Sequence, residues 1–546
     1  MKPTGSWGPR TALDVPCGSV STHAVRPEKL VAGAAAAVGV VSVVSALTPS
    51  IASRSELVQG LLPPGVPAAA RLVALGFGLA LIWLSRSLAH RRQRAWLLAV
   101  ALVAGTAAAH LAKGLDFEEA SASVVVLAAL FRYRACFDVS GDPAALRPLL
   151  ATTLALASLG SFLAAYELHR LAAPERLEDL VTVAAVLLAV RALYLWLRPW
   201  TERVREDASA RAAVRTIVDR HGRDSLAFFT LRHDKSYFFS AGRRSFLAYR
   251  VVGGAALVSG DPVGEPSELV SLLEEFRGVA HARGWRLAVL GASRELVPLY
   301  ESLGLRPVKL GDEAVVRPSR FSLEGRAIRK VRQSVSRLER AGYRARVMRA
   351  GDVDRVLRGQ LDAVSAAWLG RWPERGFVMA MDDLFTEPEA LFAIGQTAAG
   401  EVGGFLHFVP CPAAGGYSLS TMRRRGSTPN GLNEFLIAET LEWAQAHDVP
   451  RVSLNFCVFA DLLRAGEASS AGRRALRFTL LKLDHLFQIN RLLSFSGKFQ
   501  PEWEPRYVCL ERLSDLPLVG LAYLRVESLL TPPRPWAKPK EFAPNP

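Results

Sequence analysis

Six long apolar runs before residue 200 constrain the fold of this chain more than any other feature. They are Leu30–Leu47, Ala68–Leu84, Ala95–Ala112, Ala120–Phe131, Leu149–Tyr166 and Leu180–Leu197. A helix that crosses a bilayer needs about 20 apolar residues, and six such runs in succession are not expected of a buried soluble core. The sequence therefore predicts a transmembrane domain of about six helices over residues 29–200, after a cytoplasmic tail over residues 1–28.

The charges between these runs predict the orientation. Arginines gather between the second and third runs, between the fourth and fifth, and after the sixth, whereas the alternate loops carry Asp and Glu. Arginine-rich loops stay in the cytoplasm. We therefore expect a multi-pass protein of the cell membrane whose remaining residues lie in the cytoplasm, beside an anionic leaflet.

Charge, cysteine spacing and missing motifs further limit the classes of protein to which the chain can belong. Lys and Arg number 67 against 51 Asp and Glu, a formal charge of +16, and the five cysteines are scattered without a CxxC pair. That pattern excludes a disulfide scaffold and fits a reducing compartment. The ten histidines are dispersed, and HExxH, GxSxG and Walker motifs are all missing from the sequence. We expect neither a metal nor a cofactor.

The residues after 207 alternate short apolar runs with amphipathic segments. Phe246–Tyr249 and Ala255–Ser259 flank Gly253-Gly254, which is typical of a hairpin. Strand and helix patterns then recur in a similar order after Arg344. The fold class predicted is an N-terminal multi-span helical membrane domain followed by α/β tandem GNAT-like domains of the acyl-CoA N-acyltransferase type. The predicted boundaries are 207–320 for the first subdomain, 321–343 for a linker helix, 344–530 for the second subdomain and 531–546 for a Pro-rich tail.

The linker helix is basic on one face. Arginine and lysine recur at helical spacing opposite an apolar stripe, and the residues expected to contact phosphate are Arg326, Arg329, Lys330 and Arg332. Such a face is either simply solvated or attracts phosphate, from lipid headgroups or from an RNA backbone.

Two further segments carry candidate chemistry. Arg423 and its two neighbouring arginines precede a helix expected from Gly431, and a basic turn before a helix N-terminus binds anions. Glu434 falls in the first turn of that helix. In Ser496–Tyr507, Lys498, Trp503 and Arg506 are punctuated by prolines, which predicts a rigid loop with aromatic anchors.

These segments resemble the phosphatidylglycerol lysyltransferases, the aminoacyl-phosphatidylglycerol synthases also called multiple peptide resistance factors. The resemblance covers about Ala227 to Arg512. It rests on six strings in order: FFSAGRRSFLAYRVVGGAALVSGDPVG, GDEAVV, FSLEGRAIRKVRQSVSRLERAGY, WLGRWPERGF, TPNGLNEFLI and KFQPEWEPRY.

The resemblance implies two GNAT-type subdomains with a tunnel between them and the transfer of an amino acid, lysine in the family's name, from aminoacyl-tRNA to phosphatidylglycerol. The cationic lipid product would alter membrane charge and resistance to cationic antimicrobial peptides. The implied partners are aminoacyl-tRNA, phosphatidylglycerol and the anionic membrane.

The resemblance also implies roles for single residues. Arg423 and Lys498 would hold phosphate or the developing oxyanion, and Glu434 would bind the α-amino group or assist the hydroxyl. Substrate-binding roles fall to five further residues: Glu374, Ser420, Asn430, Trp503 and Arg506. Ser420 is a departure, because the family commonly has an acid at that position. Its absence puts the amino-acid specificity and the rate in question.

Two alternatives stay open. One is a membrane acyltransferase that uses acyl-CoA, whose pyrophosphate would occupy the basic turn before Gly431. The other is an inactive lipid-binding or flippase protein, which Ser420 makes conceivable.

Overall fold

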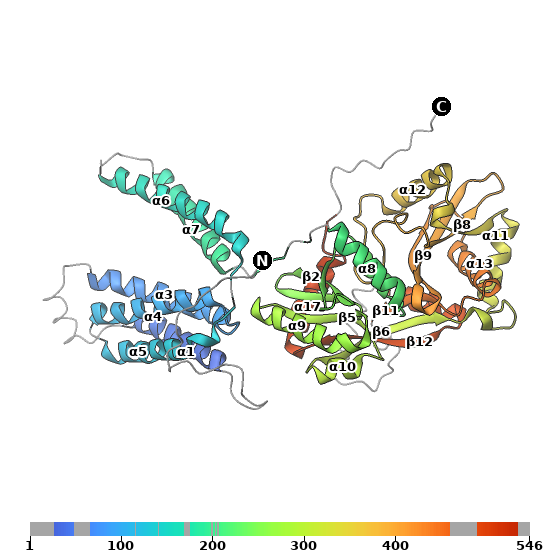
Figure 1. Cartoon of the computed structure of the whole chain (residues 1–546). Coiled ribbons are helices and arrows are strands. Elements are labelled where there is room, and N and C mark those ends of the chain that lie inside the picture. The colour runs from blue at the N-terminus through green and yellow to red at the C-terminus, as the bar shows by residue number, and fades with distance from the viewer. Residues whose placement is uncertain are drawn as a thin grey trace. The chain divides into compact units, whose positions relative to one another are not determined.

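The computed structural model describes residues 27–48, 66–114, 116–139, 141–168, 175–197, 200–202, 204, 207–458 and 489–532. The chain divides into two compact units. We call residues 1–201 with 279–285 the helical unit, and residues 202–278 with 286–546 the sheet domain. Figure 1 shows the helices of the first and the mixed sheet of the second.

Each of the six apolar runs forms a helix. The helices are α1 (Pro27–Leu47), α3 (Val66–Leu88), α4 (Gln93–Gly114), α5 (Phe117–Arg132), α6 (Leu146–Leu168) and α7 (Glu175–Leu197). Among the described residues, three segments are long and apolar enough to cross a membrane, in α1, α3 and α4. α5 has 16 residues, fewer than the ~20 that a span needs. The number of spans and the cytoplasmic side therefore stay predictions.

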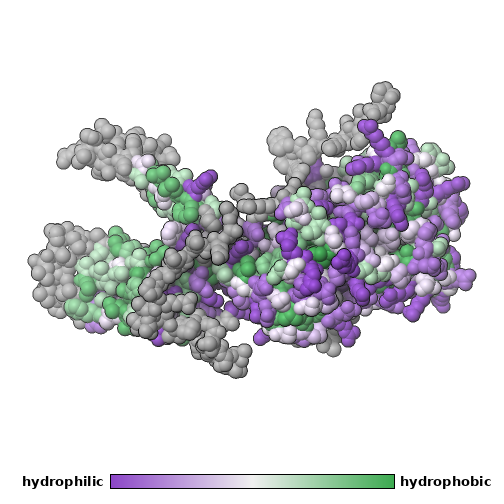
Figure 2. Space-filling view, in the orientation of Figure 1, coloured by the Kyte–Doolittle hydropathy of each residue, from purple (hydrophilic) through white to green (hydrophobic). Residues whose placement is uncertain are grey.

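Small residues let the first two helices approach closely. A Cβ added to Gly39 of α1 would lie 2.7 Å from the carbonyl oxygen of Gly78 in α3, and the reverse holds for Gly78. Contacts of this kind hold helices together in lipid, where the hydrophobic effect does not. Large apolar side chains on the outside, such as Leu72 and Val125, remain exposed, and Figure 2 shows this unit as mainly hydrophobic.

The sheet domain contains one mixed sheet. Its strands are β1 (Ser236–Phe239), β2 (Ser245–Val252), β3 (Ala255–Ser259), β4 (Val263–Gly264), β5 (Arg286–Ser293), β6 (Arg306–Val316), β7 (Arg344–Arg349), β8 (Leu391–Gln396), β9 (Val402–Cys411), β10 (Gly416–Arg424), β11 (Val452–Val458) and β12 (Glu502–Leu510). The strand order is β1-β2-β3-β5-β12-β6-β11-β10-β9-β8-β7, with β4 paired to β2.

One helix of this domain, α8, precedes the strands, and the others lie between or after them. The helices are α8 (Ala208–His221), α9 (Leu269–Ala282), α10 (Val297–Ser302), α11 (Arg329–Arg340), α12 (Arg355–Leu369), α13 (Leu432–Ala446), α16 (Ile489–Ser496) and α17 (Leu516–Val526).

A strand–helix–strand unit occurs twice in this sheet. β3 and β5 are parallel and α9 connects them, while β10 and β11 are parallel and α13 connects them. The hairpin predicted at Gly253-Gly254 is confirmed, because β2 and β3 pair up to Val252 and Ala255. Both glycines have positive φ, as a two-residue hairpin turn requires. The predicted fold class, apolar helices followed by tandem GNAT-like α/β structure, is confirmed.

The predicted rigid loop around Trp503 is wrong, since these residues form β12 between β5 and β6. Proline removes a backbone donor and is normally excluded from inner strands. Pro505 fits in β12 because the pairing of β12 with β5 begins only at the next residue, Arg506, so the missing N–H of Pro505 interrupts no pairing with β5. β12 thus returns from the predicted second subdomain to the strands of the first.

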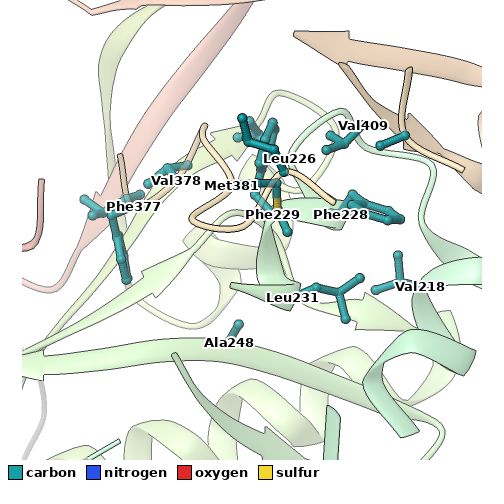
Figure 3. Packing of buried hydrophobic residues seen from close by; sticks show 14 of the residues in the cluster. Val218, Leu226, Phe228, Phe229, Leu231, Ala248, Phe377, Val378, Met381 and Val409 are labelled. Atoms are coloured by element: carbon teal, nitrogen blue, oxygen red, sulfur yellow. The ribbon is translucent and has the colours of Figure 1, made fainter. Parts of the chain in front are cut away.

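Apolar layers cover both faces of the sheet. One core contains side chains of α8, α12 and the 377–384 segment, and the other contains side chains of α11 and α13. Figure 3 shows part of the first core, where Leu226, Phe228 and Phe229 pack near Met381 and Val409. α12 and the α11–α13 pair therefore lie on opposite faces of β8 to β10 (Figure 1).

Candidate functional site

The parallel strands β10 and β11 separate soon after they begin to pair. Tyr417 pairs with Val452 and Ser418 pairs with Ser453, and the register extends no further in the described strands. Beyond this point the Asn455 side chain donates to the carbonyl oxygens of Leu419 and Met379, both at 2.9 Å. A side chain thus bridges strands that backbone hydrogen bonds no longer join, and the candidate site lies around this separation.

Arg423 lies near the carboxyl end of β10 and is almost fully buried, with 4% of its surface exposed. Its Nη2 donates to Oε2 of Glu374 at 2.6 Å. Its buried Nε has no hydrogen-bond partner within the described part of the chain. A guanidinium with one N–H committed and another available can bind an oxyanion or a phosphate. Glu374, predicted to bind substrate, is therefore the residue that orients Arg423.

Lys498 and Glu434 form a second pair. Glu434 is in the first turn of α13, and Nζ of Lys498 lies 2.7 Å from its Oε1. α13 begins over the end of β10, because a Cβ on Gly404 would lie 2.7 Å from both the Arg423 carbonyl oxygen and the Leu432 side chain. Both cation–carboxylate pairs therefore belong to the same end of β10.

The two pairs lie on opposite faces of that strand. Arg423 is in register with Phe405, which belongs to the core beneath α12. Met422 is in register with Leu406 and packs on the core beneath α11 and α13. Arg423 and Glu374 are thus on the α12 face, and the Glu434–Lys498 pair, from α13, is on the other.

Ser420 interrupts the regular pairing of β10. The register with β9 shifts between Leu419 and Thr421, as in a β-bulge. The Ser420 hydroxyl is buried and accepts a hydrogen bond from the backbone N–H of Met381 at 3.0 Å. The residue that replaces the expected acid is therefore engaged with the segment that also contains Glu374.

The basic helix predicted over 321–343 forms over a shorter range, as α11. The four basic residues expected to contact phosphate are exposed, one just before α11 and three in its first turn: Arg326, Arg329, Lys330 and Arg332. Arg332 donates to the carbonyl oxygens of Leu323 and Gly325. Arg337 donates to the carbonyl oxygen of Asn430 at 3.0 Å, so the predicted substrate residue Asn430 lies where α11 meets the turn before α13.

Arg506 and Trp503 belong to a different place. They line a cavity of about 1180 Å³. The other lining residues are 220, 221, 223, 224, 227, 261–266, 269, 293–296, 413, 414, 451, 504 and 505. Its walls come from both halves of the sheet. Arg423, Glu374, Glu434 and Lys498 are outside this lining, so the structure divides the sequence-predicted residues between two places.

Arg506 is the centre of a buried charge network. Its Nε and Nη2 donate to Glu313 Oε2 at 2.8 and 2.5 Å, and Nη1 donates to Asp224 Oδ2 at 2.7 Å. Burial opposes ionisation of Glu313, but Arg506 and the hydroxyls of Ser225 and Ser453 outweigh it and lower the pKa of that carboxyl.

Sequence reasoning missed Asp261, which lies in the cavity wall after β3. Its oxygens accept hydrogen bonds from the Tyr300 hydroxyl at 2.7 Å and from the Ser293 N–H at 3.1 Å. Burial, reinforced by the charge of Asp224, raises the pKa of Asp261 to about 6. Asp261 belongs to the SGDPVG string that contributes to the family resemblance, but nothing in the sequence places Tyr300 beside Asp261.

Lys235 and His407 were also missed. Lys235 is buried and donates to the Phe229 carbonyl and the Ser259 hydroxyl at 2.7 and 2.6 Å, and burial lowers its pKa to about 7. His407 pairs with Thr421 across β9 and β10. Burial, together with the charge of Arg423, lowers the pKa of His407 to about 3, so the ring is neutral. Within the described residues we find no cluster of side chains suited to hold a metal ion.

The sheet domain thus combines a mixed α/β sheet with two cation–carboxylate pairs beyond the point where its parallel strands β10 and β11 separate. Residues 215–510 match the sequence family described as phosphatidylglycerol lysyltransferase, C-terminal. The chain belongs to this family.

Relatives of known name agree with this assignment. The lysylphosphatidylglycerol biosynthesis bifunctional protein LysX of Rhodococcus jostii is 35% identical over 355 residues, 64% of this chain and 32% of that protein. The protein of the same name from Mycobacterium avium is 35% identical over 354 residues, 64% of this chain and 30% of its own length. The chain thus spans about a third of the length of these relatives.

Two solved structures have the same fold. The C-terminal domain of a putative lysylphosphatidylglycerol synthetase from Agrobacterium fabrum has a TM-score of 0.51 at 23% identity, over 59% of this chain and 98% of that one. L-PGS from Bacillus licheniformis has a TM-score of 0.50 at 23% identity, over 60% and 98%.

Proposed function

We propose that the protein is a membrane-bound aminoacyltransferase that moves an amino acid, lysine by its relatives' names, from aminoacyl-tRNA to phosphatidylglycerol. The observation that carries the proposal is the pair of cation–carboxylate contacts at the carboxyl end of β10, one on each face of the sheet. Arg423 with Glu374 serves one face, and Lys498 with Glu434 serves the other.

The reaction is a transesterification. The glycerol hydroxyl of the lipid attacks the aminoacyl ester carbonyl, a tetrahedral oxyanion forms, and the ribose hydroxyl of the tRNA leaves with the proton. The available Nε of Arg423 can donate to that oxyanion, and such stabilisation is usually the largest contribution in acyl transfer. The ester is already activated, so positioning supplies much of the remaining rate.

Glu434 and Lys498 act at the other side of β10. The carboxylate of Glu434 is fixed by Lys498 at 2.7 Å. It is placed to accept the hydroxyl proton or to bind the α-ammonium group of the amino acid, while Lys498 holds phosphate or adds to oxyanion stabilisation. In the described strands, β10 and β11 are not joined by backbone pairing beyond Ser418 and Ser453. We place the reacting ester where these two strands separate.

Both substrates are anionic, tRNA as a polyanion and phosphatidylglycerol through its one phosphate, and the exposed cations of the sheet domain suit them. The exposed cations of α11 contact the tRNA backbone, and α11 meets the turn before α13 through Arg337 and Asn430. The cavity lined by Trp503 and Arg506 accommodates the lipid headgroup or the aminoacyl end of the tRNA. The product is a cationic lipid, which reduces the negative charge of the leaflet and so weakens its attraction for cationic antimicrobial peptides.

The site is tested by Arg423→Ala and Lys498→Ala in the full chain. Each is expected to lower lipid aminoacylation by about 100-fold or more, the usual effect of removing one oxyanion donor. The matched control is Arg424→Ala, since Arg424 is the exposed neighbour of Arg423 on the same strand. Full activity in both site variants would contradict the assignment.

A further inference from the structure

Two exposed tryptophans lie at the C-terminal end of α12 and just after it. Trp368 and Trp372 each expose 52% of their surface. They belong to the segment Trp368–Arg375, which we call the Trp–Arg loop. Among the described residues of the sheet domain, these are the exposed aromatic side chains. Indoles have much apolar area, so two of them at the surface indicate a partner that covers them.

The Trp–Arg loop is anchored at both ends. Its first two residues are the last two of α12, which ends at Leu369, and near its other end Glu374 is fixed by Arg423 at 2.6 Å. Just beyond the loop, Phe377 is fully buried and its N–H donates to Oε1 of Glu527 at 3.1 Å. The indoles are therefore displayed by a fixed loop that ends at the candidate site.

Arginines accompany the indoles. Arg371 and Arg375 are exposed, and the Arg375 guanidinium lies 5.7 Å from the centre of the Trp372 ring. Neither has an ion-pair partner among the residues that the structure describes. Tryptophan favours the headgroup layer of a bilayer, and exposed arginines are attracted to anionic lipid. The combination matches the surface of an anionic leaflet.

The position of the loop separates it from the basic helix. α12 packs on one face of the sheet and α11 on the other, so one polyanion bound along α11 does not also cover the tryptophans. The same chain contains three segments long and apolar enough to cross a membrane. We propose that the Trp–Arg loop docks on the anionic leaflet, with both indoles in the headgroup layer, and delivers the acceptor lipid toward Arg423. The delivery step, but not the docking, rests on the proposed function.

Docking is tested without measuring activity. The full chain is placed in nanodiscs of phosphatidylcholine alone or with phosphatidylglycerol, and deuterium uptake is followed by mass spectrometry. Amides of residues 368–376 are expected to exchange about tenfold more slowly when the anionic lipid is present. Trp368→Ala/Trp372→Ala is expected to abolish this slowing. Leu518→Ala/Leu521→Ala, which removes two exposed apolar side chains of α17, is expected to retain it.

Two results would overturn the proposal. One is equal exchange of residues 368–376 in both kinds of nanodisc. The other is slowing of the loop on addition of tRNA to phosphatidylcholine nanodiscs, which would assign the loop to RNA. A loop that is protected in a protein without transferase activity would instead support docking and contradict the proposed function.

Discussion

Replacing Arg506 tests whether this residue binds substrate or holds the sheet together. Arg506 is 2% exposed and Glu313 is 1% exposed, and Arg506→Met leaves that carboxylate without its cation. Removing one partner of a buried pair costs about 3–5 kcal/mol. For a domain of this size we expect the unfolding temperature to fall by on the order of 10 °C. A surface pair on the same strand is the control, because Glu502→Gln, which removes the contacts of Arg317 and Arg320, should cost less than ~1 kcal/mol.

The assay is thermal unfolding of the full chain in nanodiscs, read by the exchange of β12 amides. The double variant Arg506→Met/Glu313→Leu removes the two fully buried charges and leaves only Asp224, which is partly exposed. It should recover most of the lost stability, since apolar groups of similar volume often replace a buried pair without loss. Aminoacylation by the double variant, measured at a temperature where it is folded, then reports any contact with substrate. An unchanged unfolding temperature in Arg506→Met, or a double variant as unstable as the single one, would refute the reasoning.

Three further predictions follow from buried groups and one turn. The pKa of Asp261 is raised to about 6. Between its ordinary pKa and about 6 the folded protein binds a proton that the unfolded chain does not, so the stability falls as the pH rises through that range. Asp261→Asn should therefore raise the unfolding temperature at pH 7.5 and have little effect near pH 4. The pKa of Lys235 is lowered to about 7, so the free-energy cost of burying its charge is greatest below pH 7 and fades toward pH 10. Lys235→Met should therefore stabilise the protein more at pH 6 than at pH 10. The opposite order in calorimetry would contradict the burial of Lys235 as a cation. Gly431 has a φ of +100°, and a Cβ added there would lie 2.7 Å from Ser334. Gly431→Ala should therefore lower the free energy of unfolding, measured in denaturant, by roughly 1–3 kcal/mol. The control Gly426→Ala, with open space around its Cβ, should not.

Local patterns predicted the elements that depend on local chemistry. The Gly253-Gly254 hairpin and the helix after Gly431 appear where the sequence placed them. β12 could not be read in this way, because Pro505 is tolerated only where β5 has not yet begun to pair. That condition is set by a strand more than 200 residues earlier.

The candidate site shows the same division. The sequence indicated Arg423, Glu434 and Lys498 by type and position, and the structure gives each a partner: Glu374 for Arg423, and Glu434 with Lys498 for one another. The sequence alone could not show that Arg506 is buried against Glu313 and Asp224, since those contacts join residues 193 and 282 positions apart. The roles of all these residues in catalysis remain predictions that the variants test.

The most direct test of the central claim is lipid aminoacylation by the purified full chain in phosphatidylglycerol nanodiscs. Each labelled aminoacyl-tRNA is supplied in turn, and the extracted lipids are separated. We predict labelled lipid from lysyl-tRNA, lost on ribonuclease treatment and lost in Arg423→Ala. Labelled lipid formed from an acyl-CoA after ribonuclease treatment, or none from any charged tRNA, would contradict the account.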